Sequence, residues 1–209
     1  MDTQHLLLFV TAAAVLIATP GPNFIYVLTR GATQGRQAAL LAVVGLCCGV
    51  IIHTTFAALG LSAILRTSAL LFTIVKFVGG GYLIYLGIRA FLSGEAPTLG
   101  APTAPPPSTA IVRQSIAASI TNPKTALFFL TFLPQFVDPA LGPVGPQMFF
   151  LGGLYMLLTL GIYGTVAYFS GTMGNWLLRE QAMARRFRWL TASVFCALGV
   201  WALLPDRRA

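Results

Sequence analysis

The sequence is poor in charged residues, and above all in acids. Only 9% of its 209 residues are charged, and five of these are Asp or Glu, whereas soluble domains carry about 25% charged residues. Hydrophobic residues make up 56% of the chain, and the mean hydropathy is +0.80. This balance excludes an ordinary soluble domain and predicts an integral membrane protein.

Cysteine and potential metal ligands are also scarce. Cys47, Cys48 and Cys196 all lie in apolar runs, so we expect them to pack in the interior, without a disulfide framework or metal spacing. No nucleophile with a base and an orienting acid is evident, and carboxylates are rare in the apolar runs. The sequence therefore predicts no metal, no cofactor and no enzymatic activity. A membrane-embedded enzyme or an accessory subunit is the least favoured alternative.

The net charge of +8 does not indicate nucleic-acid binding. The basic residues lie in short loops between apolar runs and form no basic stripe, so the positive-inside rule explains them more simply. The N-terminal residues before the first apolar run include no Lys or Arg, so they lack the basic region of a signal peptide. We expect this first run to be retained as a membrane span.

Six apolar stretches are long enough to cross the bilayer, which takes about 20 helical residues. They lie at about 5–28, 38–64, 68–92, 113–137, 145–170 and 187–204. The predicted fold is therefore all-α, with six transmembrane helices.

With these six spans, loops one, three and five lie on one side of the membrane and carry eight Arg residues, against three on the other side. The side with the excess is expected to be cytoplasmic, which leaves both termini periplasmic.

A Pro-rich cytoplasmic linker at 94–112 divides the predicted chain into two three-helix units, 1–93 and 113–209. An odd number of spans in each unit gives the two units opposite orientations, which is the inverted-repeat arrangement of many transporters. A weak internal match supports the repeat, because a basic residue precedes a glycine by eleven positions in both the third and the sixth span.

Two predicted spans contain proline deep in the apolar run, one at 19–23 and the other at 121–124. Proline removes an amide donor and displaces the carbonyl four residues back, so Pro123 frees the carbonyl of Ser119. Unpaired backbone groups are tolerated in hydrocarbon only where protein or a water-filled cavity receives them. We therefore predict that spans one and four are broken around a polar chamber at mid-membrane. The alternative is that each proline only kinks its helix.

The residues at and near these breaks are the candidate substrate ligands. Lys124 lies about ten residues into its span, roughly 15 Å deep, where its charge is costly unless it faces the interior of the bundle. Lys76 lies about 12 Å deep by the same count, so its side chain can instead extend to the interface. The candidate substrate-binding residues are Pro20, Gly21, Pro22, Asn23, Asn122, Pro123, Lys124 and Lys76.

Two further residues are candidates for proton coupling. His53 lies mid-span, and the unperturbed pKa of histidine is near physiological pH, although an interhelical hydrogen bond is the commoner role for a lone histidine. Asp138 ends the fourth span just before a proline. A solvated carboxylate at the interface is an equally good interpretation.

The two breaks also predict the kind of solute. The second half of each broken helix begins near mid-membrane, where its backbone amides and dipole favour an anionic group. Lys124 adds a full positive charge, and the freed carbonyls suit an ammonium. A small zwitterion such as an amino acid fits both. A passive channel built from paired half-helices remains the main alternative.

At these residues the chain resembles the LysE/RhtB family of amino-acid exporters. The resemblance covers nearly the whole chain except the linker. It rests on residues 19–23, 31–36, Gly45, Gly49, Gly60, Lys76, Gly79, Tyr82, Leu83, Leu86, Gly87, 122–124, 128–130 and 133–136. It implies a six-span exporter in a bacterial inner membrane, driven by the proton gradient, that removes amino acids such as threonine, homoserine, lysine or leucine. Its partners would be that solute, protons and the bilayer. Gly45-x-x-x-Gly49 is expected to pack helices within one subunit, with a homodimer interface as the alternative.

Overall fold

The structure is a computed structural model that describes residues 3–61, 69–92 and 104–177, together with 189–190, 192–197, 199–200 and 203 near the C-terminus. Across these residues the chain forms helices and short connections, and no strand. In chain order the elements are α1 (Thr3–Ala18), α2 (Pro22–Gln34), α3 (Arg36–Phe56), η1 (Ala57–Leu61), α5 (Ala69–Leu92), α6 (Ser108–Ile120), α7 (Pro123–Leu127), η2 (Phe128–Phe132), η3 (Leu133–Phe136), η4 (Pro139–Leu141) and α8 (Val144–Leu177).

Four candidate membrane spans emerge from the described residues. Arg36–Gly60 and Val144–Ser170 are each long and apolar enough to cross a bilayer. Two further candidates are bent pairs, α1 with α2 at 50° and α6 with the helical segment Pro123–Phe136 at 51°. The all-helical membrane fold is thus confirmed, and both bends occur where the prolines predicted a break. The total of six spans and the inverted repeat stay predictions, since much of the sixth stretch lies outside the described residues.

Several helices extend beyond the predicted spans. α2 continues to Gln34 and α6 begins at Ser108, before the predicted start of its span. Hydropathy marks where a chain leaves hydrocarbon, whereas helical hydrogen bonding continues into the polar interface. α2 stops at Gly35, which turns the chain into α3 with φ of +87°. That conformation strongly favours glycine.

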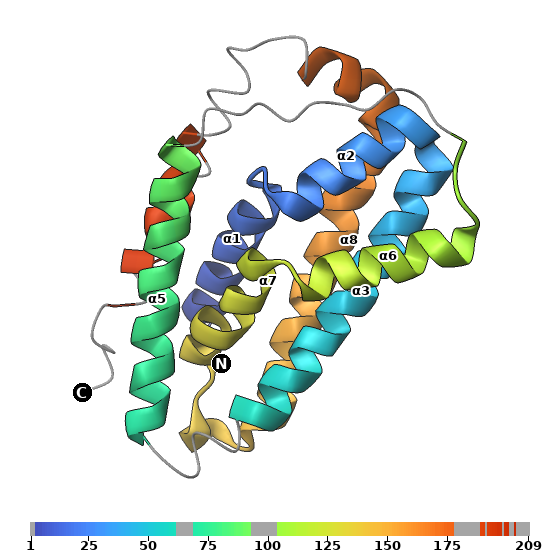
Figure 1. Ribbon diagram of the computed structural model, residues 1–209. Coiled ribbons are helices and arrows are strands. Elements are labelled where there is room, and N and C mark those ends of the chain that lie inside the picture. The colour runs from blue at the N-terminus through green and yellow to red at the C-terminus, as the bar shows by residue number, and fades with distance from the viewer. Residues whose placement is uncertain are drawn as a thin grey trace.

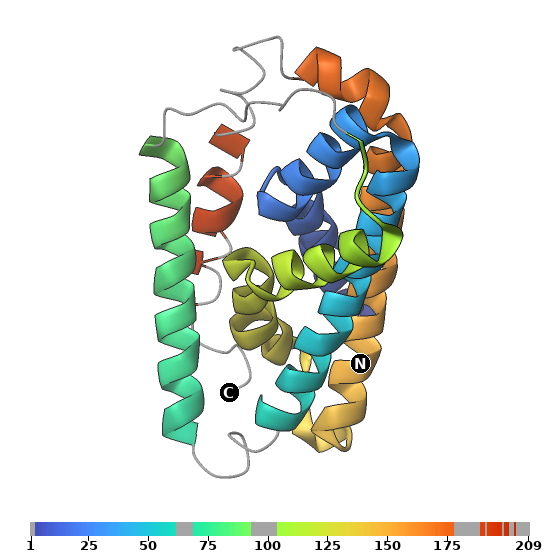
Figure 2. The same cartoon turned by 45° about the vertical axis from the view of Figure 1, so that its right-hand side comes forward.

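The helices are arranged around α1 and α7, which lie near the centre of the bundle (Figure 1). α3 and α8 run side by side along one flank, with α6 packed across α3. α5 stands on the opposite flank, next to the described C-terminal segments (Figure 2). Contact there is close, because a Cβ added at Gly87 would lie 2.6 Å from the Cys196 Sγ atom and one added at Gly199 would lie 2.7 Å from the Gly80 carbonyl oxygen.

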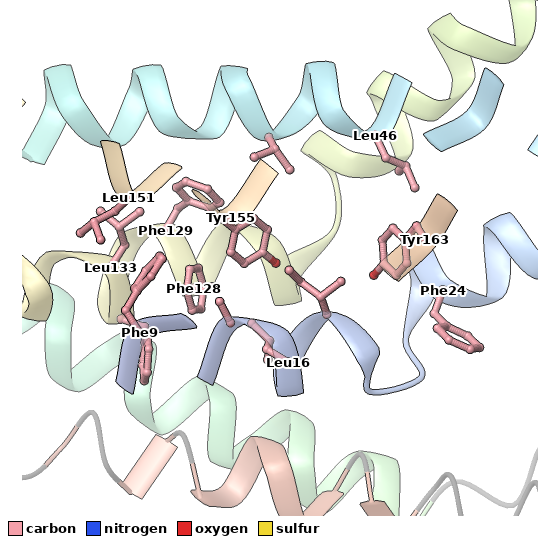
Figure 3. Close-up of a cluster of buried hydrophobic side chains, with 14 of the residues drawn as sticks. Phe9, Leu16, Phe24, Leu46, Phe128, Phe129, Leu133, Leu151, Tyr155 and Tyr163 are labelled. Atoms are coloured by element: carbon pink, nitrogen blue, oxygen red, sulfur yellow. The ribbon is translucent and has the colours of Figure 1, made fainter. Parts of the chain in front are cut away.

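Aromatic side chains fill the centre of the bundle between α1, η2 and α8 (Figure 3). The ring centroids of Phe128 and Tyr155 are 4.7 Å apart, those of Phe9 and Phe128 are 5.8 Å apart, and Phe9 meets Phe136 edge to face at 5.3 Å. Such pairs contribute about 0.5–1.5 kcal/mol each beyond the area they bury. This cluster holds the half-helix that follows the second break against the half-helix that precedes the first.

The glycine pair of α3 packs against α6 within the same chain. A Cβ at Gly45 would lie 2.5 Å from Ser115 Cβ, and a Cβ at Gly49 would lie 2.3 Å from Ser119 Cβ. These glycines therefore permit close helix approach inside the subunit, as expected. That use leaves this face of α3 covered by α6.

We predict that Gly49→Ala lowers the stability of the protein by about 1–3 kcal/mol, the usual effect of overpacking a tight interface. Gly161→Ala is the matched control, because a Cβ there has no neighbour within 4 Å. The measurement is thermal unfolding in detergent. Equal unfolding temperatures for the two variants would contradict a tight α3–α6 contact at Gly49.

Candidate functional site

The first break separates α1 from α2 over three residues. Both the backbone N–H and the hydroxyl of Thr19 donate to the Val15 carbonyl, at 3.0 and 2.6 Å, so the last turn of α1 closes on itself. Gly21 then adopts an extended conformation, and α2 begins at Pro22. The Thr19 carbonyl lies outside the regular hydrogen bonding of both helices.

The second break separates α6 from α7. The Asn122 side-chain oxygen accepts from the Lys124 backbone N–H at 3.0 Å and so caps α7. Pro123 occupies the first position of α7, where a missing N–H does no harm. The Asn122 side-chain oxygen therefore bonds to the backbone of its own turn.

His53 hydrogen-bonds to the Ser119 carbonyl, the group that Pro123 frees. Its Nε2 atom lies 3.1 Å from the Ser119 carbonyl oxygen, which also accepts from the Asn122 N–H at 3.2 Å. Because a carbonyl only accepts, the His53 Nε2 carries the hydrogen. The imidazole also stacks on Phe129, with centroids 5.7 Å apart. His53 thus contacts the chain on both sides of the second break, as an interhelical hydrogen bond would require.

Lys124 joins the two breaks. Its side chain is only 3% exposed, and its Nζ donates to the Thr19 carbonyl at 2.7 Å across 105 residues of sequence. A Cβ added at Gly21 would lie 3.3 Å from the Lys124 stem, and the ring of Phe195 lies 5.7 Å from Nζ. The Lys124 side chain is therefore enclosed by the Thr19 carbonyl, Gly21 and the Phe195 ring.

Asn23 is buried at the start of α2, with 5% of its surface exposed. Its side-chain oxygen makes no hydrogen bond to the residues that the structure describes. A buried acceptor without a donor costs about 1–3 kcal/mol. Such a group in a folded protein calls for an explanation, and a ligand that supplies the donor is one.

Two buried tyrosines of α8, Tyr155 and Tyr163, add hydroxyl groups to the interior of the bundle. Figure 3 shows the hydroxyls of Tyr155 and Tyr163 turned toward each other. The Tyr155 hydroxyl also interacts with the Thr125 side chain, one residue after Lys124. Neither tyrosine is among the site residues predicted from the sequence. Their eight-residue spacing on one apolar helix is the signal that could have drawn attention to them.

The remaining candidates are Asp138 and Lys76. The Asp138 side chain accepts from the Ala140 N–H at 3.0 Å and caps η4, in the connection that leads to α8. Lys76 belongs to α5, but its side chain lies outside the described residues. The structure thus brings Lys124 together with the 19–23 segment, and places Asp138 in a turn.

The charge of Lys124 has no carboxylate partner in the described part of the chain. Asp138 is the one acidic residue that this part contains, and it caps a different turn. Nor do the described residues include a group of three or more metal-ligating side chains. The described groups that lie against the buried Lys124 Nζ are the Thr19 carbonyl and the Phe195 ring.

We predict that His53→Leu lowers the free energy of unfolding by about 1–2 kcal/mol, because it removes one interhelical hydrogen bond and one ring stack. His53→Gln keeps an N–H donor and should lose less. Unfolding curves in detergent measure both. A leucine variant as stable as the unmodified protein would contradict the role of His53 at the second break.

Comparison with known proteins places this geometry in context. The family model described as LysE type translocator matches residues 14–205. A leucine efflux protein of Enterobacter sp. (strain 638) is 32% identical over 168 residues, which cover 78% of this chain and 77% of that protein.

Other relatives match over almost their full length. A protein of Vibrio cholerae named an uncharacterized membrane protein is 28% identical and covers 96% of this chain and 97% of its own. The membrane protein YrhP of Bacillus subtilis is 26% identical, with 94% and 97% covered. No solved structure matches this chain.

Proposed function

We propose, because this chain belongs to the family of LysE type translocators, that it exports small amino acids or closely related metabolites across a bacterial inner membrane. Family membership makes it a multi-pass membrane transporter and confirms that it is not an enzyme. The leucine efflux proteins among its relatives support an amino acid as the solute. The contact between Lys124 Nζ and the Thr19 carbonyl supports the location of the site.

The two groups of that contact, the Lys124 Nζ and the Thr19 carbonyl, are of the kinds that bind the two ends of an amino acid. Without a solute, they bond to each other. The ammonium of Lys124 is a partner for a carboxylate, and the first turn of α2 adds backbone donors at the positive end of a thirteen-residue helix. The Thr19 carbonyl is a partner for an ammonium. An amino acid that enters between them replaces one protein–protein bond with two bonds to the solute.

In the proposed cycle the two breaks separate and rejoin. With Lys124 bound to Thr19 the site is closed, since the lysine is almost fully buried. Alternating access follows if one three-helix unit rocks against the other around this contact. For the whole chain we still predict six spans in two inverted repeats, with both termini periplasmic.

We further propose that export is coupled to proton antiport. His53 is the candidate carrier inside the membrane, and Asp138 is the candidate at its edge. His53 is well placed because it binds the Ser119 carbonyl at the second break. A change in its protonation would act on a point where the helix already bends.

Lys124→Gln is expected to reduce export by roughly tenfold to a hundredfold, because a hydrogen bond to a charged group contributes about 1.5–3 kcal/mol. The measurement is uptake into inside-out vesicles. Arg113→Gln removes a cation from an exposed position on α6 and serves as the control. Unchanged export by a well-folded Lys124 variant would reject this lysine as a solute ligand.

An exporter should concentrate its solute in proteoliposomes when a proton gradient is imposed, and should lose that gradient of solute when a protonophore is added. A passive channel would only equilibrate the solute, with or without the protonophore. Equilibration without accumulation would therefore favour the channel and overturn proton-coupled export.

A further inference from the structure

An apolar groove of about 310 Å³ opens on the outside of the bundle along α1. Its walls come from three parts of the chain, and they include Leu8 and Val15 of α1, Phe132 and Phe136 of η2 and η3, and Val194 and Ala197 of the helical residues 192–197. The Leu8 and Val15 side chains are 58% and 46% exposed. The groove is therefore open to the surroundings of the protein.

The medium outside this groove is lipid. α1 belongs to one of the bent helix pairs that are long and apolar enough to cross a bilayer. Thr11 is the polar residue among those that line the groove, and its hydroxyl donates to the Leu7 carbonyl at 2.8 Å. The side chains that line the groove therefore offer no free hydrogen-bond donor, and their chemistry suits an apolar ligand.

The width of the groove decides between a lipid and a protein segment. Leu8 and Val15 are two helical turns apart, which is about 10 Å along α1. A volume of about 310 Å³ over that length leaves a cross-section of about 30 Å². A helix with its side chains is about 10–12 Å wide and needs about 80–110 Å². The groove is thus too narrow for a helix from a second copy of the chain, but it accommodates one unbranched hydrocarbon chain.

One wall of the groove also covers Lys124. Val194 and Ala197 flank Phe195, which is buried and whose ring lies 5.7 Å from the Lys124 Nζ. The segment 192–197 therefore contacts the groove through two residues and the lysine through a third. A hydrocarbon chain between this segment and α1 gains van der Waals contacts with both. These contacts are lost if the segment moves away from α1.

We propose that the groove binds one acyl chain of a membrane phospholipid, and that this chain holds residues 192–197 in place so that Phe195 covers Lys124. A ligand that binds one conformation better than another shifts the population toward that conformation. The bound chain thus stabilises the closed form of the site. Its binding does not depend on what the protein transports, so it goes beyond the proposed export function.

The first test is photo-crosslinking of the full-length protein in vesicles of phosphatidylethanolamine and phosphatidylglycerol, with a trace of a phospholipid that carries a diazirine midway along one acyl chain. Val15 in the groove and Phe77 on α5 both lie near the middle of their predicted spans and are 46% and 54% exposed. Bulk lipid therefore reaches them about equally. Mass spectrometry of the digest should show at least about threefold more lipid on the groove residues than around Phe77, because a bound chain is retained there. Equal labelling, or no labelling of the groove, would overturn the proposal.

Two threonine variants give an independent test. Thr11 and Thr165 are both exposed, and each hydroxyl donates to the carbonyl four residues back at 2.8 Å, but Thr11 lines the groove. Added phospholipid should raise the unfolding temperature of the unmodified protein and of Thr165→Phe in detergent. The rise should be less than about half as large for Thr11→Phe, whose ring occupies the groove. Equal rises for the two variants would contradict a chain bound in the groove.

Both tests are separate from the proposed function, because neither measures transport. If Thr11→Phe does not fold, the crosslinking pattern of the unmodified protein decides the outcome. A protein that exports amino acids without preferential labelling of the groove would overturn the lipid site and leave the proposed function intact.

Discussion

The hydrogen bond from Lys124 to the Thr19 carbonyl is the interaction on which the centre of this protein depends. Each partner is difficult to place in a membrane on its own. A lysine at mid-depth costs several kcal/mol, and a carbonyl released from its helix has no water to bind in hydrocarbon. Placed together, they satisfy each other. The two helix breaks are therefore mutually dependent, although they lie 105 residues apart.

The surrounding packing brings the two breaks into contact. α6 approaches α3 closely because Gly45 and Gly49 present no side chain to it. That approach carries the Ser119 carbonyl within reach of His53, so the freed backbone group finds a donor. On the other side, Phe9 of α1 packs on Phe128 beyond the second break. The glycines thus allow the helices to approach closely, and the aromatic rings fill the remaining space between helices.

The hydrogen bond between Lys124 and Thr19 has a direct consequence for the proposed transport cycle. With no solute, separation of the breaks would leave the Lys124 ammonium and the Thr19 carbonyl unpaired, so the closed form is favoured. In the proposed cycle, a zwitterion would supply both replacement partners and remove that penalty. Binding and opening are then linked through differential affinity for two states, which is the requirement for any ligand-driven conformational change. The Asn23 side-chain oxygen, which lacks a partner in the described residues, is a further acceptor in the first turn of α2.

Much of this could be predicted from the sequence because the signals are local. Apolar runs identify membrane helices, proline breaks them at fixed positions, and a lysine too deep in such a run to reach the interface is expected to face the interior. The positions of both bends and the burial of Lys124 follow from these rules. The resemblance to a known family adds the class of function.

What the tertiary structure alone decided is which groups meet. Nothing near Thr19 in the sequence indicates that its carbonyl receives Lys124, and nothing near His53 indicates Ser119. Phe195 reaches the lysine from near the other end of the chain. Sequence periodicity shows that a side chain is buried, but its partner depends on how helices from distant parts of the chain cross. The sequence by itself determined that two membrane helices are interrupted and that one carries a buried charge. Only the packing of the bundle decided that the two interruptions satisfy each other, because that depends on contacts between residues with no local relationship.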